Sequence, residues 1–193
     1  MKKSSGMTLI EMIIAIVLMG IAMVAFTSFL VPQIRDSAIP HYQTRAAALG
    51  QGFMSQILAR GFDENSDFDG GTVRCGENGV SCTDVKKLGA DKKLDGSLET
   101  TPSDFNDVDD YIGCWSTSTT ASQCDGIPRG NISDVLGANS TEQYKNFRLE
   151  VSVAYDDLTD KAPDEITEYK KVTLRIFAGN TQPLTLTAIK GNY

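Results

Sequence analysis

An α+β fold is predicted for this chain, in which a long amino-terminal helix packs on a small antiparallel sheet of three or four strands. Three features of the sequence indicate it: an apolar segment that turns amphipathic, three alternating runs at the carboxyl end, and a region rich in turn-forming residues between them. With 193 residues, the chain has room for one compact domain and a membrane element, which excludes an assembly of several catalytic domains.

The apolar segment, residues 12–31, contains no charged side chain. At a rise of about 1.5 Å per residue it spans roughly 30 Å, the thickness of the hydrocarbon core of a bilayer. A secretory signal peptide has a shorter apolar run followed by a small-x-small cleavage site, whereas this run is followed by PQIR at residues 32–35. The simplest interpretation is a membrane anchor, with Lys2 and Lys3 on the cytoplasmic side.

Glu11 does not fit a plain anchor. It lies one turn into the apolar helix, where burying a carboxylate costs about 2.5–3.5 kcal/mol at mid-membrane and somewhat less near an interface. We therefore expect this carboxylate to have a positively charged partner.

The sequence GMTLIE at residues 6–11, with a short basic leader before it and an apolar run after it, resembles the amino-terminal signature of type IV prepilins and of the pseudopilins of type II secretion. The resemblance implies that prepilin peptidase removes the leader, residues 1–6, by cutting after Gly6. It also implies N-methylation of Met7, where the family often has phenylalanine, and a transmembrane and assembly helix over residues 7–34.

Cleavage after Gly6 would give Met7 a free α-amino group, which is cationic near neutral pH because its pKa is about 7.7–8.0. When identical or similar helices pack with an axial stagger, this ammonium can face the Glu11 carboxylate of a neighbouring subunit. Wrong registers would leave both charges unpaired. Charge pairing and the resemblance both assign Glu11 to docking and register in a filament, not to acid–base catalysis.

Residues 35–61 are predicted to form an amphipathic helix. Apolar side chains recur at spacings of three and four, which places them on one face of a helix: Tyr42, Ala46, Leu49, Phe53 and Ile57. Gly61 is suited to the C-cap, while Gly50 and Gly52 each weaken the helix by about 1 kcal/mol relative to alanine.

Residues 62–145 are rich in Gly, Asp, Ser, Thr and Asn and are predicted to be mostly loop, with a short turn of helix near residues 108–112. This region contains the four cysteines of the chain: Cys75, Cys82, Cys114 and Cys124. An even number of cysteines in an extracytoplasmic region indicates disulfides, and their spacing lacks the C-x-x-C pairs of zinc sites. Of the three possible connectivities we favour neighbour pairing, Cys75 with Cys82 and Cys114 with Cys124.

Two acidic segments raise the question of a metal. In DENSDFDGG, residues 63–71, the side-chain oxygens match the first half of an EF-hand loop, but the twelfth position is Gly76 where a bidentate glutamate is needed. The sequence therefore predicts a solvated acidic turn with no metal. The same interpretation applies to a second cluster, Asp104, Asp107, Asp109 and Asp110. No cofactor is expected.

Residues 146–193 are predicted to form three antiparallel strands. Apolar side chains alternate with others in three runs, residues 147–155, 172–176 and 184–188. The apolar face of this sheet would cover the stripe of the amphipathic helix, so that helix and sheet share one core.

Charge and motifs exclude several classes of function. Without Lys2, Lys3 and Glu11 the chain has 16 basic and 24 acidic residues, and such an acidic domain would be repelled by nucleic acid and by anionic lipid headgroups. The sequence contains no Walker A loop, no H-E-x-x-H and no G-x-S-x-G motif, and its one histidine, His41, gives no basis for a histidine triad. We expect neither an enzyme nor a small-molecule substrate.

Two further runs, RGFDENSD at residues 60–67 and FNDVDDY at residues 105–111, resemble minor prepilins of the mannose-sensitive haemagglutinin (MSHA) pilus. This resemblance implies a pilin-like fold and a structural subunit of an adhesion pilus. The subunit would cross the inner membrane once, with its carboxy-terminal domain in the periplasm, before it joins a pilus at the cell surface. The implied partners are prepilin peptidase, other pilin subunits and the assembly machinery. Two alternatives remain: a type II secretion pseudopilin and a monomeric membrane-anchored binding domain.

Overall fold

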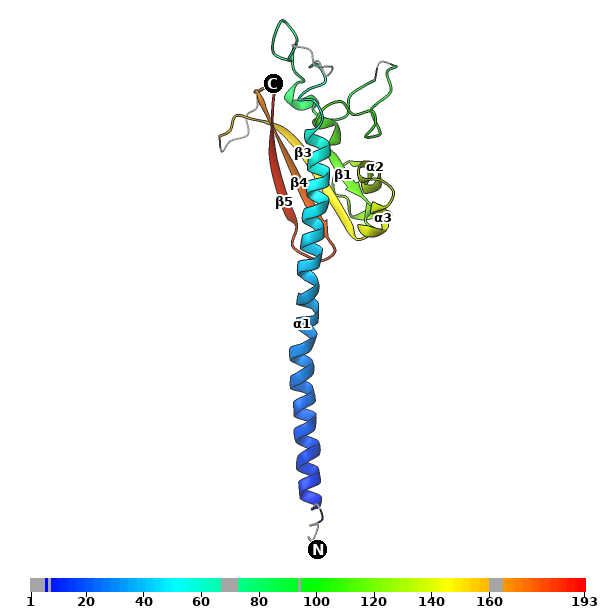
Figure 1. Ribbon diagram of the computed structural model, residues 1–193, viewed down its shortest axis with the longest axis vertical. Helices are drawn as coiled ribbons and strands as arrows, with labels where there is room; N and C mark the ends of the chain where they lie inside the picture. The colour runs from blue at the N-terminus through cyan, green and yellow to red at the C-terminus, as the bar shows by residue number, and fades with distance from the viewer. Residues whose placement is uncertain (1–5, 7, 67–72, 94, 160–164) are drawn as a thin grey trace. The chain divides into compact units, whose positions relative to one another are not determined.

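The computed structural model describes residues 6, 8–66, 73–93, 95–159 and 165–193 (Figure 1). The chain divides into two compact units, Met1–His41 and Tyr42–Tyr193. Helix α1, Leu9–Leu58, contributes to both. The two units are described separately below.

The first unit is dominated by the apolar part of α1. Among the described residues, one helical segment, Leu9–Gln33, is long and apolar enough to cross a membrane, and its side chains are exposed. The hydroxyls of Thr27 and Ser28 donate to carbonyls three or four residues earlier in the same helix. These polar groups are therefore satisfied within the helix, as a lipid environment requires. The predicted apolar helix is confirmed.

The second unit contains a mixed sheet, in which five strands among the described residues have the order β2-β1-β3-β4-β5. The strands are β1 Gly113–Ser116, β2 Pro128–Asn131, β3 Phe147–Asp156, β4 Tyr169–Ala178 and β5 Leu184–Gly191. The last three are antiparallel neighbours, which confirms the three predicted strands.

Strands β1 and β2 were not predicted, and they correct the expected sheet of three or four antiparallel strands. Strand β1 pairs antiparallel with β3, but β2 pairs parallel with β1. Each has only four residues, too few for a visible alternation, and β2 contains Pro128 and Gly130, which are uncommon inside strands. Tertiary pairing with β3 makes these segments strands despite their weak local signal.

The core lies between the sheet and the part of α1 that begins at Tyr42, which crosses one face of the sheet in Figure 1. The predicted stripe is confirmed, because Ala46, Leu49, Phe53 and Ile57 are at most 2% exposed. Facing them are alternate residues of the long strands: Leu149, Val151, Val153, Val172, Leu174 and Ile176. Helix and sheet thus form one core, as predicted from the spacing of three and four residues in the helix and the alternation in the strands.

Part of the region expected to be loop also enters this core. Phe105, Tyr111 and Trp115 pack with Phe53 of α1, and their neighbouring ring centroids lie 4.8–6.2 Å apart. The indole N–H of Trp115 donates to the carbonyl of Tyr111 at 2.9 Å. The predicted short turn is the 3-10 helix η2, Asp109–Tyr111. The region's other short helices are η1 Val85–Lys87, η3 Ala121–Gln123, α2 Ile132–Leu136 and α3 Ser140–Gln143.

Gly50 allows α1 to approach the sheet closely. A Cβ atom at this position would lie 2.6 Å from Cδ1 of Leu186 and 2.9 Å from Cδ1 of Ile176. Such distances are shorter than carbon–carbon contacts allow. Gly50 lowers helix propensity, as the sequence indicated, but its missing side chain also leaves the space that Leu186 and Ile176 occupy.

Replacing Gly50 with valine should therefore lower the free energy of unfolding by about 1–3 kcal/mol, because the added methyl groups overpack the core. Valine in place of the adjacent exposed Gln51 tests helix propensity alone and should change stability by at most about 0.5 kcal/mol. Chemical denaturation of the full chain in non-ionic detergent measures both values. Equal effects of the two variants would contradict the close packing at Gly50.

Candidate functional site

The amino-terminal end of α1 carries the residues that the sequence assigned to processing and assembly. The helix begins at Leu9, directly after Thr8. The backbone N–H of Thr8 donates to the Glu11 carboxylate oxygen Oε2 at 3.4 Å, and the N–H of Glu11 donates to Oγ1 of Thr8 at 3.4 Å. This reciprocal pair is a capping box, which satisfies N–H groups that have no partner inside the helix.

The capping role of Thr8 was missed in the sequence, although the signal was present. A threonine three residues before a glutamate, at the start of an apolar run, is the sequence pattern of a capping box. Glu11 therefore has a partner within its own chain. That partner supplies a hydrogen bond and no positive charge, so it does not provide the cation expected for a carboxylate on an apolar helix.

The other residues assigned to this site are placed in part. Gly6 is exposed, as access by a peptidase requires, while Met7 lies outside the described residues. Glu11 is exposed, and within the described part of the chain it forms no salt bridge. The exposed apolar side chains that follow it include Met12, Ile13 and Ile16. The segment thus presents one acidic group on an otherwise apolar surface.

A buried ion network lies in the second unit, where a solvated surface was expected. The ammonium Nζ of Lys170 in β4 lies 2.6 Å from Oδ1 of Asp109 and 3.2 Å from Oδ2 of Asp63. All three side chains are 0% exposed. The Phe62 and Tyr155 rings lie beside the ammonium, with centroids at 4.9 and 5.3 Å. The prediction that Asp63 and Asp109 are solvated is wrong, because Lys170 supplies the charge that lets them be buried.

The pKa values follow this arrangement. Burial alone would raise the pKa of Asp63, but the Lys170 charge and hydrogen bonds from Thr83 and Asn65 outweigh it and lower this pKa. Burial alone would lower the pKa of Lys170, but the surrounding aspartates outweigh it and raise this pKa. The pair is therefore held in its charged form.

Two more aspartates of the second acidic cluster are also buried, contrary to the prediction. Asp107 and Asp110 are 0% exposed, and each accepts two backbone N–H groups of its own turn. Burial and the charge of Asp109 raise the pKa of Asp107 to about 9. Asp104 alone is only partly buried, with its side chain 24% exposed, and Lys93 pairs with it at 2.8 Å.

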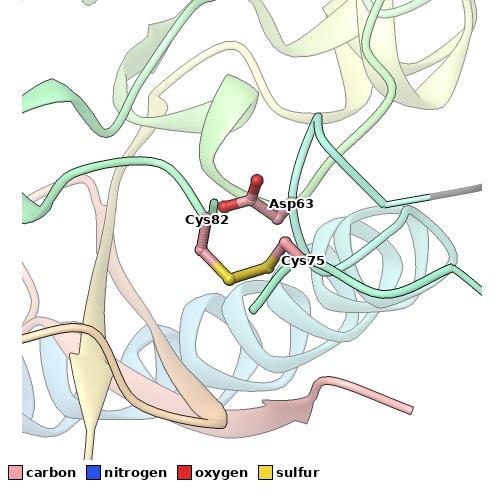
Figure 2. A group of neighbouring side chains, drawn as sticks. All are labelled: Asp63, Cys75 and Cys82. Atoms are coloured by element: carbon pink, nitrogen blue, oxygen red, sulfur yellow. A yellow bond between two sulfur atoms is a disulfide. The ribbon is translucent and has the colours of Figure 1, made fainter. Parts of the chain in front are cut away.

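The four cysteines form two disulfides, Cys75–Cys82 and Cys114–Cys124, which is the favoured neighbour pairing. Figure 2 shows the sulfur–sulfur bond of the first beside the carboxylate of Asp63. Asp63, Cys75 and Cys82 are close enough to hold a metal ion. However, disulfide sulfurs are not thiolate ligands, and both oxygens of Asp63 already accept hydrogen bonds, from Thr83 and Lys170 among others. This group is a structural contact, not a metal centre.

Removing the Lys170 ammonium should destabilise the second unit strongly. Lys170→Met leaves Asp63 and Asp109 buried without their cation, so the free energy of unfolding should fall by about 3–5 kcal/mol. The neighbouring Lys171 is the matched control, because its side chain is 44% exposed and its partner, the 5% exposed Asp156, also accepts from the backbone N–H of Leu158. Lys171→Met should cost less than about 1 kcal/mol. Chemical denaturation of both variants measures the difference, and a Lys170→Met variant as stable as Lys171→Met would refute the network.

Comparison with known proteins identifies the amino-terminal segment. Residues 1–27 match the family model described as the prokaryotic N-terminal methylation motif. No curated protein and no solved structure matches the chain. The motif gives the chain a type IV prepilin-like amino terminus, of the kind processed by prepilin peptidase. An exposed apolar helix follows this motif, and an α+β unit follows the helix, an arrangement that fits a membrane-anchored pilin or pseudopilin.

Proposed function

We propose that this chain is a minor pilin of an MSHA-type adhesion pilus, a structural subunit similar to the D prepilin of that pilus, MshD. The observation that carries the pilin part of the proposal is the methylation motif at residues 1–27, which overlaps the apolar segment Leu9–Gln33. Members of such a family act as structural subunits and not as enzymes. The subunit assembles through its amino-terminal helix with other pilins.

The charge distribution supports an anchor with the second unit in the periplasm. Lys2 and Lys3 precede the apolar segment, and the positive-inside rule places such residues in the cytoplasm. The disulfides of the second unit support the same orientation, because disulfides persist in the periplasm and are reduced in the cytosol. After assembly, this unit would lie on the pilus at the cell surface.

The capping box occupies one carboxylate oxygen of Glu11 and leaves the other available for assembly. Its oxygen Oε2 accepts from the N–H of Thr8, so Oε1 can accept from the ammonium of a neighbouring subunit. Cutting after Gly6 creates that ammonium at Met7, and N-methylation preserves its charge. Since an unpaired carboxylate costs about 2.5–3.5 kcal/mol at mid-membrane, packing that pairs the two charges is favoured over other registers.

The MSHA assignment rests on the sequence resemblance of two runs, which lie next to each other in the structure. Gly61 of the first run and Asp107 of the second are joined by a parallel bridge. The N–H of Gly61 donates to the carbonyl of Asn106 at 2.9 Å, and the N–H of Val108 donates to the carbonyl of Gly61 at 3.1 Å. The two resembling runs therefore form one structural feature, which connects the end of α1 to the aromatic part of the core.

A type II secretion pseudopilin is the second candidate, because the methylation motif is equally compatible with it. A deletion strain separates the two. Loss of surface pili with normal protein secretion supports the pilin, and loss of secretion with normal piliation supports the pseudopilin. A monomeric anchored domain would affect neither process and would need no processing.

The assembly role of Glu11 is tested with two variants expressed in the deletion strain. Glu11→Ala removes the carboxylate, so the protein should insert into the membrane but fall at least about tenfold in sheared pili, consistent with a charge-pairing loss of about 1.4 kcal/mol or more. Thr8→Ala removes half of the capping box and keeps the carboxylate, so it should still be incorporated. Immunoblots of membrane and pilus fractions measure both. Normal incorporation of Glu11→Ala would contradict the register role.

A further inference from the structure

The buried ion network places an amine and a carboxyl group in direct contact where water is excluded. Nζ of Lys170 in β4 lies 2.6 Å from Oδ1 of Asp109 in η2, and both side chains are 0% exposed. An amine and a carboxylic acid condense to an amide with loss of water, and two groups that a fold holds in contact react far faster than the same groups free in solution. This contact therefore brings together the two groups that an amide bond needs.

Amide formation requires the amine and the acid in their uncharged forms, and burial favours these forms. It is the largest single influence on both partners of the salt bridge between Lys170 and Asp63: it acts to lower the pKa of the lysine and to raise the pKa of the aspartic acid. The opposite charges outweigh it, so the ion pair predominates. Moving one proton from the ammonium to a carboxylate nevertheless leaves the total charge of the network unchanged. The uncharged pair is thus reached inside the protein without a proton from solvent.

Asp63 is positioned to carry this proton. Its Oδ2 lies 3.2 Å from Nζ of Lys170. The backbone N–H of Thr83 donates to Oδ2 at 2.9 Å, and the backbone N–H of Asn65 donates to Oδ1 at 3.1 Å. These bonds fix the carboxylate beside the ammonium and stabilise it as an anion when it has released the proton. A carboxylate in this position can act first as a general base and then as a general acid.

Asp109, not Asp63, is the carboxyl group suited to react. Its Oδ1 contacts Lys170, while its Oδ2 accepts from the backbone N–H of Gly89 at 3.0 Å. Negative charge builds on one carboxyl oxygen when an amine adds to the carbon, and a fixed N–H beside that oxygen stabilises the charge. Oδ2 can therefore become the amide oxygen, and Oδ1 can leave.

We propose that Lys170 and Asp109 form an intramolecular isopeptide bond, with Asp63 as the proton carrier. Asp63 accepts one proton from the ammonium, and Nζ adds to Cγ of Asp109. The bond between Cγ and Oδ1 then breaks, and Oδ1 leaves as water with two protons, one returned by Asp63 and one taken from Nζ. An ammonium and a carboxylate are thus converted to an amide and one water molecule. No oxidant, reductant or other reactant is consumed, and the charge of Asp63 is unchanged.

The bond would join η2 to β4, which the sequence separates by 61 residues. The two disulfides close much shorter loops, with sequence separations of 7 and 10. Because a longer closed loop restricts the unfolded chain more, the isopeptide bond would add the most restrictive of these three links. It would also persist when the disulfides are reduced. The second unit would then stay cross-linked whether or not the chain joins a filament.

A second pair in the same strand supplies an internal control. Nζ of Lys171 also lies 2.6 Å from a carboxylate oxygen, Oδ2 of Asp156, but the lysine side chain is 44% exposed. Water stabilises the ammonium there and competes for the contact, so the ion pair has little tendency to become an uncharged pair. Distance is therefore matched between the two pairs, and burial differs. We expect no bond between Lys171 and Asp156.

The experiment analyses the full chain, purified in non-ionic detergent, by mass spectrometry after reduction, alkylation and digestion with trypsin. We expect a linked species that joins residues 94–129, which contain Asp109, to residues 162–171, which contain Lys170. Its mass should be lower than the sum of the two peptides by one water molecule, and fragmentation should place the link on Lys170. Residues 149–161, which contain Asp156, should remain unlinked.

Two variants test the proton carrier. Asp63→Asn keeps the size of the side chain but removes the general base, so the linked fraction at a fixed time after expression should fall at least about tenfold. Asp156→Asn is the matched control and should leave the linked fraction unchanged. An unchanged linked fraction in Asp63→Asn would show that Asp63 does not carry the proton.

The unmodified chain decides the proposal even where Asp63→Asn does not fold. Absence of the linked species, with residues 162–170 recovered as a free peptide, overturns it. So does a link from Lys170 to residues 61–74, because Asp63 would then be the reacting acid. Lys170→Arg keeps the positive charge but has no amine, so a linked species of the same mass relation in this variant would identify the signal as an artefact and overturn the proposal.

Discussion

A single carboxylate on an apolar helix is the constraint around which the amino-terminal unit is organised. Glu11 obtains hydrogen bonds from the capping box with Thr8, but these bonds supply no positive charge. The surrounding segment, Leu9–Gln33, is apolar and exposed, so it offers no cation either within its described residues. A neighbouring subunit with a new amino terminus is the partner that the proposed function supplies. Proteolytic processing would create the ammonium, and polymerisation would bring it to the Glu11 carboxylate of a neighbouring subunit.

The same chain handles acidic groups in apolar surroundings in two different ways. Asp63 and Asp109 use a resident cation, Lys170, which is fully buried between them. Glu11 is proposed to use an ammonium from another subunit. The source of positive charge thus separates a structural network, which is complete within the subunit, from a site that becomes complete only on binding.

Most of the fold was predictable because its signals are local. The α1 stripe follows from a period of three to four residues, and strands β3, β4 and β5 follow from the alternating runs at residues 147–155, 172–176 and 184–188. Strands β1 and β2 have four residues each and depend on pairing with β3, so no local pattern marks them. The disulfides were also predictable, because each one joins two cysteines that are neighbours in the sequence.

The electrostatic part was less predictable because it depends on contacts between distant residues. Nothing near Asp63 or Asp109 in the sequence points to Lys170 in β4, so the acidic turns were assigned to solvent. The packing role of Gly50 also depends on distant residues, since Leu186 and Ile176 of the sheet occupy the space that a side chain at this position would take. Thr8 is different, because its spacing from Glu11 is a local signal that could have been recognised.

The most direct test of the central claim is the mass of the amino-terminal peptide of mature protein isolated from cells. The account predicts a peptide that begins with N-methylated Met7, because only removal of residues 1–6 creates the ammonium that pairs with Glu11. A mature protein that still begins at Met1 would contradict the account, since no such ammonium would exist next to the apolar helix.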